Sequence, residues 1–224
     1  KIFSTVSNKY DLMNDAMSFG LHRLWKEKML LVSKPQDNET VLDIATGTGD
    51  IALKLLNKRN SLNITCLDEN NDMLQLCKDR LVDNGYINNI EFINSSIEDA
   101  DLAKNYYSLV TIAFGFRNFT DHSKALDNIY KSILPGGRLV IMEFSTPENN
   151  ILKNIFEKYT HLIIPNMGKF LVNDYDSYKY LADSISSYYT LAEVDQLFTE
   201  NGFENARHEL LPGSMVSIHI GFKC

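Results

Sequence analysis

Residues 41–50 read VLDIATGTGD, where a short apolar run gives way to small residues and ends on an acid. The apolar part predicts a buried strand over Thr40–Ala45, and a helix is expected over Gly49–Lys58. The small residues between them let a ligand approach the backbone closely. In an open α/β sheet, ligands bind beyond the carboxyl ends of the strands, where this loop falls. The stretch therefore predicts a ligand site at a strand-to-helix turn.

The rest of the chain continues this alternation of strands and helices, which is typical of a parallel sheet covered on both faces. We predict a single doubly wound α/β domain over residues 1–224, with an N-terminal helical flap (1–35) and a helical lid insertion (146–190). Further strands are expected at Asn63–Leu67, Ile90–Ile93, Leu109–Phe114, Arg138–Phe144, Arg207–Leu211 and Val216–Phe222. Further helices are expected at Tyr10–Val32 with a break near residue 20, Asn70–Asn84, Asp121–Ile133, Leu152–Ile164 ending at Pro165, and Leu191–Asn201.

Composition narrows the function classes. A chain of 224 residues can hold one such domain with a lid. The net charge of −7 argues against a nucleic-acid partner, because such binding depends on Lys and Arg. No apolar run reaches the length of a transmembrane helix. Cys66, Cys77 and Cys224 form no paired motif, and no His/Cys cluster has ligand spacing, so we predict no metal site. The chain begins with Lys1, so it gives no information on targeting.

The acidic residues around the loop separate two classes of nucleotide site. A dinucleotide site has a GxGxxG loop whose backbone N–H groups face a pyrophosphate. Here the pattern is DxAxGxG, and Asp43 and Asp50 would face a diphosphate unfavourably. They suit the cationic, aminoacid-bearing end of S-adenosylmethionine (SAM). Asp68, which ends the second strand, can accept hydrogen bonds from ribose hydroxyls. We therefore predict a class I SAM-methyltransferase fold, a Rossmann-like, seven-stranded and mostly parallel sheet, in preference to an NAD-dependent oxidoreductase.

Two longer stretches go beyond this generic fold. Residues 9–26 read KYDLMNDAMSFGLHRLWK and residues 134–145 read LPGGRLVIMEFS. Both closely resemble the signatures of the UbiE/MenG quinone C-methyltransferase family and its mitochondrial counterpart. FGFRNF at 114–119, ND at 173–174 with YKYL at 178–181, and VSIH at 216–219 are also similar to that family. The chain departs from it at Thr46, where Gly or another small residue is frequent, and at Ala113, where Ser is frequent.

The resemblance implies a reaction and a cofactor. SAM would donate a methyl group to a ring carbon of a polyprenylated benzoquinol or of a demethylmenaquinol, leaving S-adenosylhomocysteine. The residues expected to bind SAM are Asp43, Ala45, Thr46, Gly47, Thr48, Gly49, Asp68, Glu69, Ser96, Ile97 and Ala113. A SAM methyltransferase for a small molecule or sterol is disfavoured by residues 9–26. A catalytically silent scaffold subunit of a quinone-synthesis complex is the alternative of another class, and it predicts failure to bind SAM.

Catalysis requires a more nucleophilic ring carbon, which an ionised adjacent hydroxyl provides. A guanidinium favours that phenolate, since opposite charge lowers the pKa of an acid. Arg117, just past the fourth strand, is the candidate for this role, although an ion pair with Glu143 or Asp121 is an alternative. Asn118 is a candidate to hydrogen-bond a ring oxygen. His22 is a candidate for proton transfer, with a purely structural role as the alternative.

The substrate side is expected to include Tyr10, Met13, Asn14, Asp174, Tyr178 and His219. The long apolar tail implies that the protein visits a membrane, on the cytoplasmic face of a bacterial inner membrane or the matrix face of the mitochondrial one. Leu162–Pro165 and residues 170–172 suggest an apolar mouth, with Lys153, Lys158 and Lys169 suited to anionic lipid. A packed lid or a dimer contact explains these residues equally well. A homodimer and other quinone-biosynthesis proteins are further partners that we consider.

Overall fold

The architecture is a seven-stranded sheet flanked by helices, as a computed structural model shows for all residues except 1–14, 19, 148–149 and 212–214. The strands lie in the order β3-β2-β1-β4-β5-β7-β6. They are β1 (Thr40–Ile44), β2 (Asn63–Asp68), β3 (Ile90–Asn94), β4 (Tyr107–Ala113), β5 (Ile133–Phe144), β6 (Glu204–Leu210) and β7 (Val216–Phe222). Strands β1 to β5 are parallel, and β7 is antiparallel to both neighbours. The predicted fold class is confirmed.

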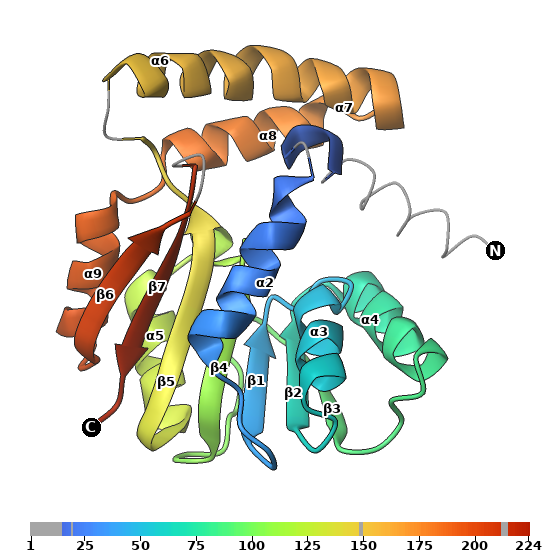
Figure 1. Cartoon of the computed structure of the whole chain (residues 1–224), viewed down its shortest axis with the longest axis vertical. Coiled ribbons are helices and arrows are strands. Elements are labelled where there is room, and N and C mark those ends of the chain that lie inside the picture. The colour runs from blue at the N-terminus through green and yellow to red at the C-terminus, as the bar shows by residue number, and fades with distance from the viewer. Residues whose placement is uncertain (1–14, 19, 148–149, 212–214) are drawn as a thin grey trace.

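Helices cover both faces of the sheet (Figure 1). They are α2 (Leu21–Ser33), α3 (Asp50–Lys58), α4 (Asn71–Asp83), α5 (His122–Ser132), α6 (Asn150–Lys158), α7 (Ile164–Val172), α8 (Tyr175–Ser186) and α9 (Leu191–Glu200). Side chains alternate across a strand, so Val41 packs with α2, α3 and α4 on one face and Leu42 packs with α5 and α9 on the other. Burial on both faces explains why the central strands read as continuous apolar runs.

Side-chain caps fix several helix starts. The Asn70 side chain accepts hydrogen bonds from the backbone N–H groups of Asp72 and Met73, and Asp121 caps α5 in the same way. Thr190 and Glu193 form a reciprocal capping box at the start of α9. The first two caps hold the helices that follow β2 and β4 at the carboxyl edge of the sheet.

The segment around Pro165 differs from the prediction that a helix ends there. A π-helical turn, Tyr159–Ile163, follows α6, and the chain then continues directly into α7. Pro165 lies in the first turn of α7, the part of a helix where proline is best tolerated. The prediction was wrong because it treated proline as a stop signal. Helix α8, capped by Asp174, was not predicted separately.

Helices α6, α7 and α8 lie together above the carboxyl ends of the parallel strands (Figure 1).

Strand β5 begins five residues earlier than predicted, at Ile133, and pairs with β4 through a register shift. No helix in the described part of the chain combines the length and apolar character needed to span a bilayer.

Candidate active site

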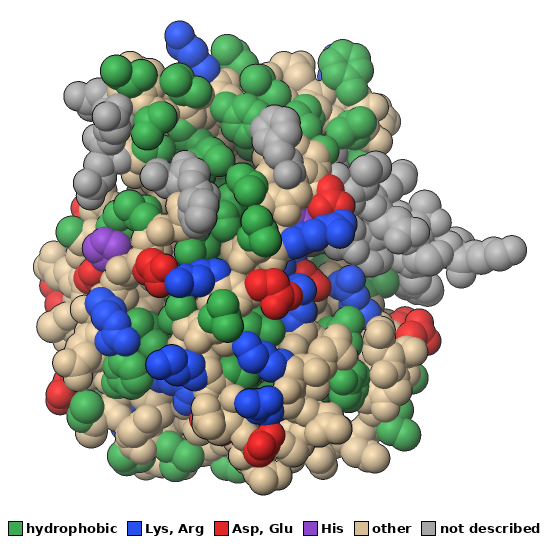
Figure 2. Space-filling view, viewed as in Figure 1, with side chains coloured by type: hydrophobic (Ala, Val, Ile, Leu, Met, Phe, Trp, Pro, Cys, Tyr) green, Lys and Arg blue, Asp and Glu red, His purple; other side chains and the backbone are tan. Residues whose placement is uncertain are grey.

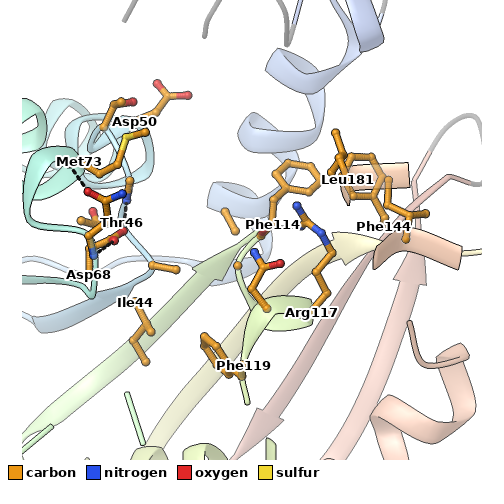
Figure 3. Close-up of a pocket in the computed structure, with 18 of the residues that line it drawn as sticks. Ile44, Thr46, Asp50, Asp68, Met73, Phe114, Arg117, Phe119, Phe144 and Leu181 are labelled. Atoms are coloured by element: carbon orange, nitrogen blue, oxygen red, sulfur yellow. Dashed lines mark hydrogen bonds between the residues drawn. The ribbon is translucent and has the colours of Figure 1, made fainter. Parts of the chain in front are cut away.

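A cavity of about 610 Å³ lies at the carboxyl ends of β1, β2 and β4, under α7 and α8. This volume is in the range of small-molecule and cofactor sites. Figure 3 shows its labelled residues in two groups. Thr46, Asp50, Asp68 and Met73 lie on the β1–β2 side, and Phe114, Arg117, Phe144 and Leu181 lie on the other side.

The loop after β1 reaches the cavity in an unusual backbone conformation. Ala45 has a φ of 51°, in the left-handed region that non-glycine residues rarely occupy. A Cβ atom added to Gly115, in the loop after β4, would lie 2.4 Å from the Cβ of Ala45. Only glycine therefore allows these two loops to meet at the centre of the sheet edge.

Asp68, at the end of β2, connects the loop after β1 to the loop after β2. Its Oδ2 accepts a hydrogen bond from the Gly47 N–H at 2.8 Å, and its Oδ1 accepts one from the Asn70 N–H at 2.9 Å. The side chain is nearly buried yet lines the cavity. Each carboxylate oxygen can accept a second hydrogen bond, so Asp68 can still bind hydroxyl groups of a ligand.

Asp43 lies beneath the loop, buried and hydrogen-bonded. The Thr46 and Thr111 hydroxyls each donate to one of its carboxylate oxygens, both at 2.7 Å. Burial raises the pKa of the Asp43 carboxyl to about 6, against the lowering effect of the two hydroxyls. Asp50, the other acid of the motif, accepts a hydrogen bond from the buried Lys26, so its charge is balanced within the protein.

Of the residues predicted to bind the cofactor, Gly49 alone does not line the cavity. A Cβ added to it would lie 2.5 Å from Cys77 Sγ, so this glycine allows α3 to pack against α4. All the other residues of that set line the cavity, namely Asp43, Ala45, Thr46, Gly47, Thr48, Asp68, Glu69, Ser96, Ile97 and Ala113.

Arg117 lies in the short 3₁₀ turn after β4 and lines the opposite side of the cavity. Its Nη1 is 2.8 Å from Oε1 of Glu143, a fully buried residue near the end of β5. Its Nε donates to Ser184 Oγ at 3.3 Å, and the guanidinium lies 5.4 Å from the centre of the Phe144 ring. The alternative ion pair with Glu143 is thus present, and it holds the guanidinium at the cavity wall. Asn118 lines the cavity beside it.

His22, on α2, faces the same cavity. Its Nε2 is 2.8 Å from Asp15 Oδ1, while its buried Nδ1 has no hydrogen-bond partner among the described residues. Burial lowers the pKa of His22, so the neutral imidazole predominates at neutral pH. Nδ1 can then accept a proton while Nε2–H donates to Asp15.

The predicted substrate residues divide into three groups. Asp174 and Tyr178 line the cavity. Tyr10, Met13 and Asn14 lie outside the described residues. His219 does not line the cavity, because alternation along β7 directs it toward α9, where its Nδ1 is 2.8 Å from Asp195 Oδ1. The prediction of substrate contact at His219 is therefore corrected.

Several cavity residues were not predicted as site residues, although most lie in the stretches that resemble the family. Trp25, Met73, Phe114, Phe144 and Leu181 come from α2, α4, the loop after β4, β5 and α8, and give the cavity its apolar wall. Phe114 connects them, since its ring centre is 6.4 Å from that of Trp25 and 4.9 Å from that of Phe144. Any of these residues read alone in the sequence is indistinguishable from a core residue.

Known proteins resemble this chain both in sequence and in fold. "Ubiquinone/menaquinone biosynthesis C-methyltransferase UbiE" of Marinomonas sp. is 40% identical over 224 residues, which is 100% of this chain and 89% of the relative. The protein of that name from Francisella tularensis subsp. novicida is 39% identical over 223 residues, 99% of this chain and 89% of the relative.

Solved structures agree with the fold. A SAM-dependent methyltransferase from Aquifex aeolicus matches with a TM-score of 0.67 at 17% identity, covering 89% of both chains. Phosphoethanolamine N-methyltransferase 2 of Haemonchus contortus, in complex with SAM, matches with a TM-score of 0.66 at 13% identity, covering 88% of this chain and 52% of the other. Residues 1–223 match the ubiE/COQ5 methyltransferase family, so the chain belongs to that family.

Proposed function

We propose that this protein transfers the methyl group of SAM to a ring carbon of a polyprenylated quinol, either a benzoquinol of ubiquinone synthesis or a demethylmenaquinol. The observation that carries the proposal is the cavity itself. It places the loop after β1 and Asp68 opposite an arginine set among aromatic side chains. No feature of the described residues favours the alternative of a silent scaffold.

The β1–β2 side suits SAM. Asp68 would bind the ribose hydroxyls, Thr46–Thr48 the aminoacid end, and Ser96 and Ile97 the adenine. The close approach of Ala45 and Gly115 leaves backbone, rather than side chains, at the centre of the site. When bound, SAM would supply an electrophilic methyl group on a sulfonium, and the Asp43 carboxylate, which lines this side of the cavity, would favour the cationic cofactor.

The opposite side suits the quinol ring. Arg117 would bind the ring oxygen and stabilise its phenolate form, while Glu143 holds the guanidinium in place. Asn118 would orient the ring through a second oxygen. His22 is the candidate to accept the hydroxyl proton, which leaves a phenolate whose ortho carbon can attack a methyl group. The resulting dienone then loses its ring proton to solvent, and the oxygen takes back a proton to restore the aromatic quinol. Phe114 and Phe144 exclude water around the charged ring.

Turnover with two matched acceptors tests this chemistry. A short-tailed quinol with free hydroxyls is expected to accept the methyl group, whereas the same quinol with both hydroxyls already methylated is expected to be inert. Only the free hydroxyl can ionise and activate the ring. Equal turnover of the two acceptors would contradict a phenolate mechanism.

The pKa of Asp43 predicts a pH dependence of SAM binding. At pH 5 the carboxyl is mostly protonated in the free protein, and at pH 7 it is mostly ionised. A bound cation favours the ionised form, so the dissociation constant of SAM should fall about tenfold between pH 5 and pH 7. Calorimetric titration at several pH values measures this.

Asp43→Asn is the control, because it keeps a polar group between the two threonines and removes the ionisation. The dependence on pH should largely disappear in that variant. If the slope between pH 5 and pH 7 is unchanged in Asp43→Asn, another group is responsible and the assignment to Asp43 is wrong.

Helices α6 to α8 have an outer face that suits a membrane surface. Phe170 is 81% exposed, Ile151 71% and Leu162 62%, and Figure 2 shows hydrophobic side chains gathered over this end of the molecule. Exposed apolar patches of this kind mark interaction sites. On their inner side the same helices contribute Phe156 and Ile164 to the cavity. We infer that helices α6 to α8, within the predicted lid insertion (146–190), form a lid through which a prenyl tail reaches the bilayer, and that the described part of the N-terminal region, including α2, belongs to the predicted flap.

Charge supports an anionic lipid surface in particular, since Lys153, Lys158 and Lys169 are exposed on α6 and α7. The double variant Leu162→Glu, Phe170→Glu should lose most of its cosedimentation with anionic vesicles. Ile87→Glu, which changes a residue 70% exposed near the end of α4, should bind as the unmodified protein does. If the double variant instead binds vesicles normally and changes the oligomeric state in light scattering, the face is a dimer contact.

A further inference from the structure

A second cluster of functional side chains lies outside the cavity, between α9 and the strands β6 and β7. His208 and His219 are paired directly across the two strands, so both side chains point to the same face of the sheet. Asp195 of α9 lies over them, with Oδ2 2.7 Å from His208 Nδ1 and Oδ1 2.8 Å from His219 Nδ1. None of the three lines the cavity at the carboxyl edge of the sheet.

The residue types and their spacing match a metal site. Two imidazole nitrogens and one carboxylate oxygen are common ligands of Zn²⁺ and related ions. One ligand atom from each residue lies within 4.8 Å of the others. Ligands placed about 2.0–2.2 Å from a tetrahedral ion are about 3.3–3.6 Å apart, so small shifts of these side chains bring the three groups to the distances that an ion requires. We propose that Asp195, His208 and His219 bind a divalent transition-metal ion such as Zn²⁺.

The surroundings of His219 prepare it as a ligand. Its Nε2 is 3.1 Å from the hydroxyl of Ser217, which is fully buried two residues earlier on the same strand. Without an ion, Nδ1–H donates to Asp195 and a neutral ring accepts from the Ser217 hydroxyl on Nε2. When a metal binds, the other tautomer, with Nε2–H donating to that hydroxyl, leaves the lone pair on Nδ1 for the ion, which is the usual arrangement around ligating histidines.

The exposure of the cluster leaves room for access. His219 is buried, whereas His208 and Asp195 remain partly exposed to solvent. An ion can therefore enter from outside, and a water molecule can complete a fourth position as it does in three-ligand zinc sites. The bound ion would connect β6, the edge strand of the sheet, to helix α9. Its expected effect is to stabilise this edge of the fold, independently of methyl transfer.

Zn²⁺ titration by calorimetry tests the proposal on the whole chain. A Cys224→Ser background and a tag without histidine remove the exposed thiol and external ligands. We expect one equivalent of Zn²⁺ to bind, with a rise in melting temperature. His208→Ala and Asp195→Ala should each weaken binding by more than about 100-fold, because even the loss of an outer partner of a ligand costs about 10–100-fold.

The matched control is His161→Ala, which removes an exposed histidine whose Nδ1 is 3.6 Å from Asp183 on a different part of the surface. That variant should bind Zn²⁺ as the background protein does. In ¹⁵N NMR of the imidazoles, the Nδ1 signals of His208 and His219 should move on adding Zn²⁺ while those of His161 do not. Absence of binding, or binding that persists in a folded His208→Ala variant, overturns the proposal.

Discussion

Replacing Arg117 with methionine is expected to lower kcat for methyl transfer by about 10²–10³-fold, the usual effect of removing one group that stabilises a developing anion. The guanidinium is held at the cavity wall by Glu143 at 2.8 Å and stacks beside Phe144. A phenolate formed without it would be uncompensated in a largely apolar cavity. Initial rates with labelled SAM and a short-tailed quinol measure the effect.

The same substitution also removes the partner of a buried carboxylate. Leaving such a charge unpaired costs about 3–5 kcal/mol of stability, so Arg117→Met alone could lose activity by unfolding. The double variant Arg117→Met, Glu143→Gln removes both charges. Its amide oxygen can still accept from one of the two backbone N–H groups, of residues 117 and 144, that now bond different oxygens of Glu143.

We expect denaturant titration to show that the double variant recovers most of the lost stability, while its activity stays low. That separation would assign a catalytic role to Arg117. A double variant that is both stable and within a few-fold of normal activity would show that the ion pair serves the fold alone.

Asp68→Ala is expected to weaken SAM binding by at least about 100-fold, because hydrogen bonds to a charged group contribute about 1.5–3 kcal/mol each. Two effects combine in this variant. The ribose loses its acceptor, and the loop after β1 loses the contact from Gly47 N–H to Asp68 at 2.8 Å. Calorimetry with SAM gives the affinity directly.

Asp72→Ala is the matched control, since it removes an exposed carboxylate from the first turn of the next helix without touching the cavity. Its affinity for SAM should equal that of the unmodified protein. If Asp68→Ala and Asp72→Ala behave alike while both remain folded, the cofactor is bound elsewhere than proposed.

Local patterns predicted the elements that hold the cofactor side. The apolar run of β1, the small residues of its loop and the acid ending β2 all occur within 30 residues, and parallel pairing brings them together. The pair of Arg117 and Glu143 was also anticipated, as an alternative, and the structure explains it, because Arg117 follows β4 and Glu143 lies near the end of the neighbouring strand β5. In such cases the topology alone implies proximity.

The proposed metal site shows which kind of site could not be predicted from a single sequence. Asp195, His208 and His219 have no ligand spacing along the chain, and they meet only because β6 and β7 pair in one particular register. A shift of one residue would turn His208 to the other face, where Arg207 and Glu209 point. The sequence therefore offered no reason to propose a metal site here, and the assignment of His219 to the substrate missed its place under α9 for the same reason.

The π-helical turn before Pro165 is a second case. Its hydrogen bonding depends on packing among α6, α7 and α8. No residue in Tyr159–Ile163 has a conformational preference from which a π-helical turn could be predicted. Proline rules describe the local backbone, whereas the course of the lid is set by tertiary contacts.

The central claim is tested most directly by locating the transferred methyl group. The protein is incubated with SAM carrying a ¹³C-labelled methyl group and a short-tailed quinol, and the product is examined by NMR. We predict a labelled methyl on a ring carbon next to a hydroxyl, formed by the unmodified protein and nearly absent with Arg117→Met, Glu143→Gln. Label on a ring oxygen, or no transfer from a folded protein that binds SAM, would contradict the account.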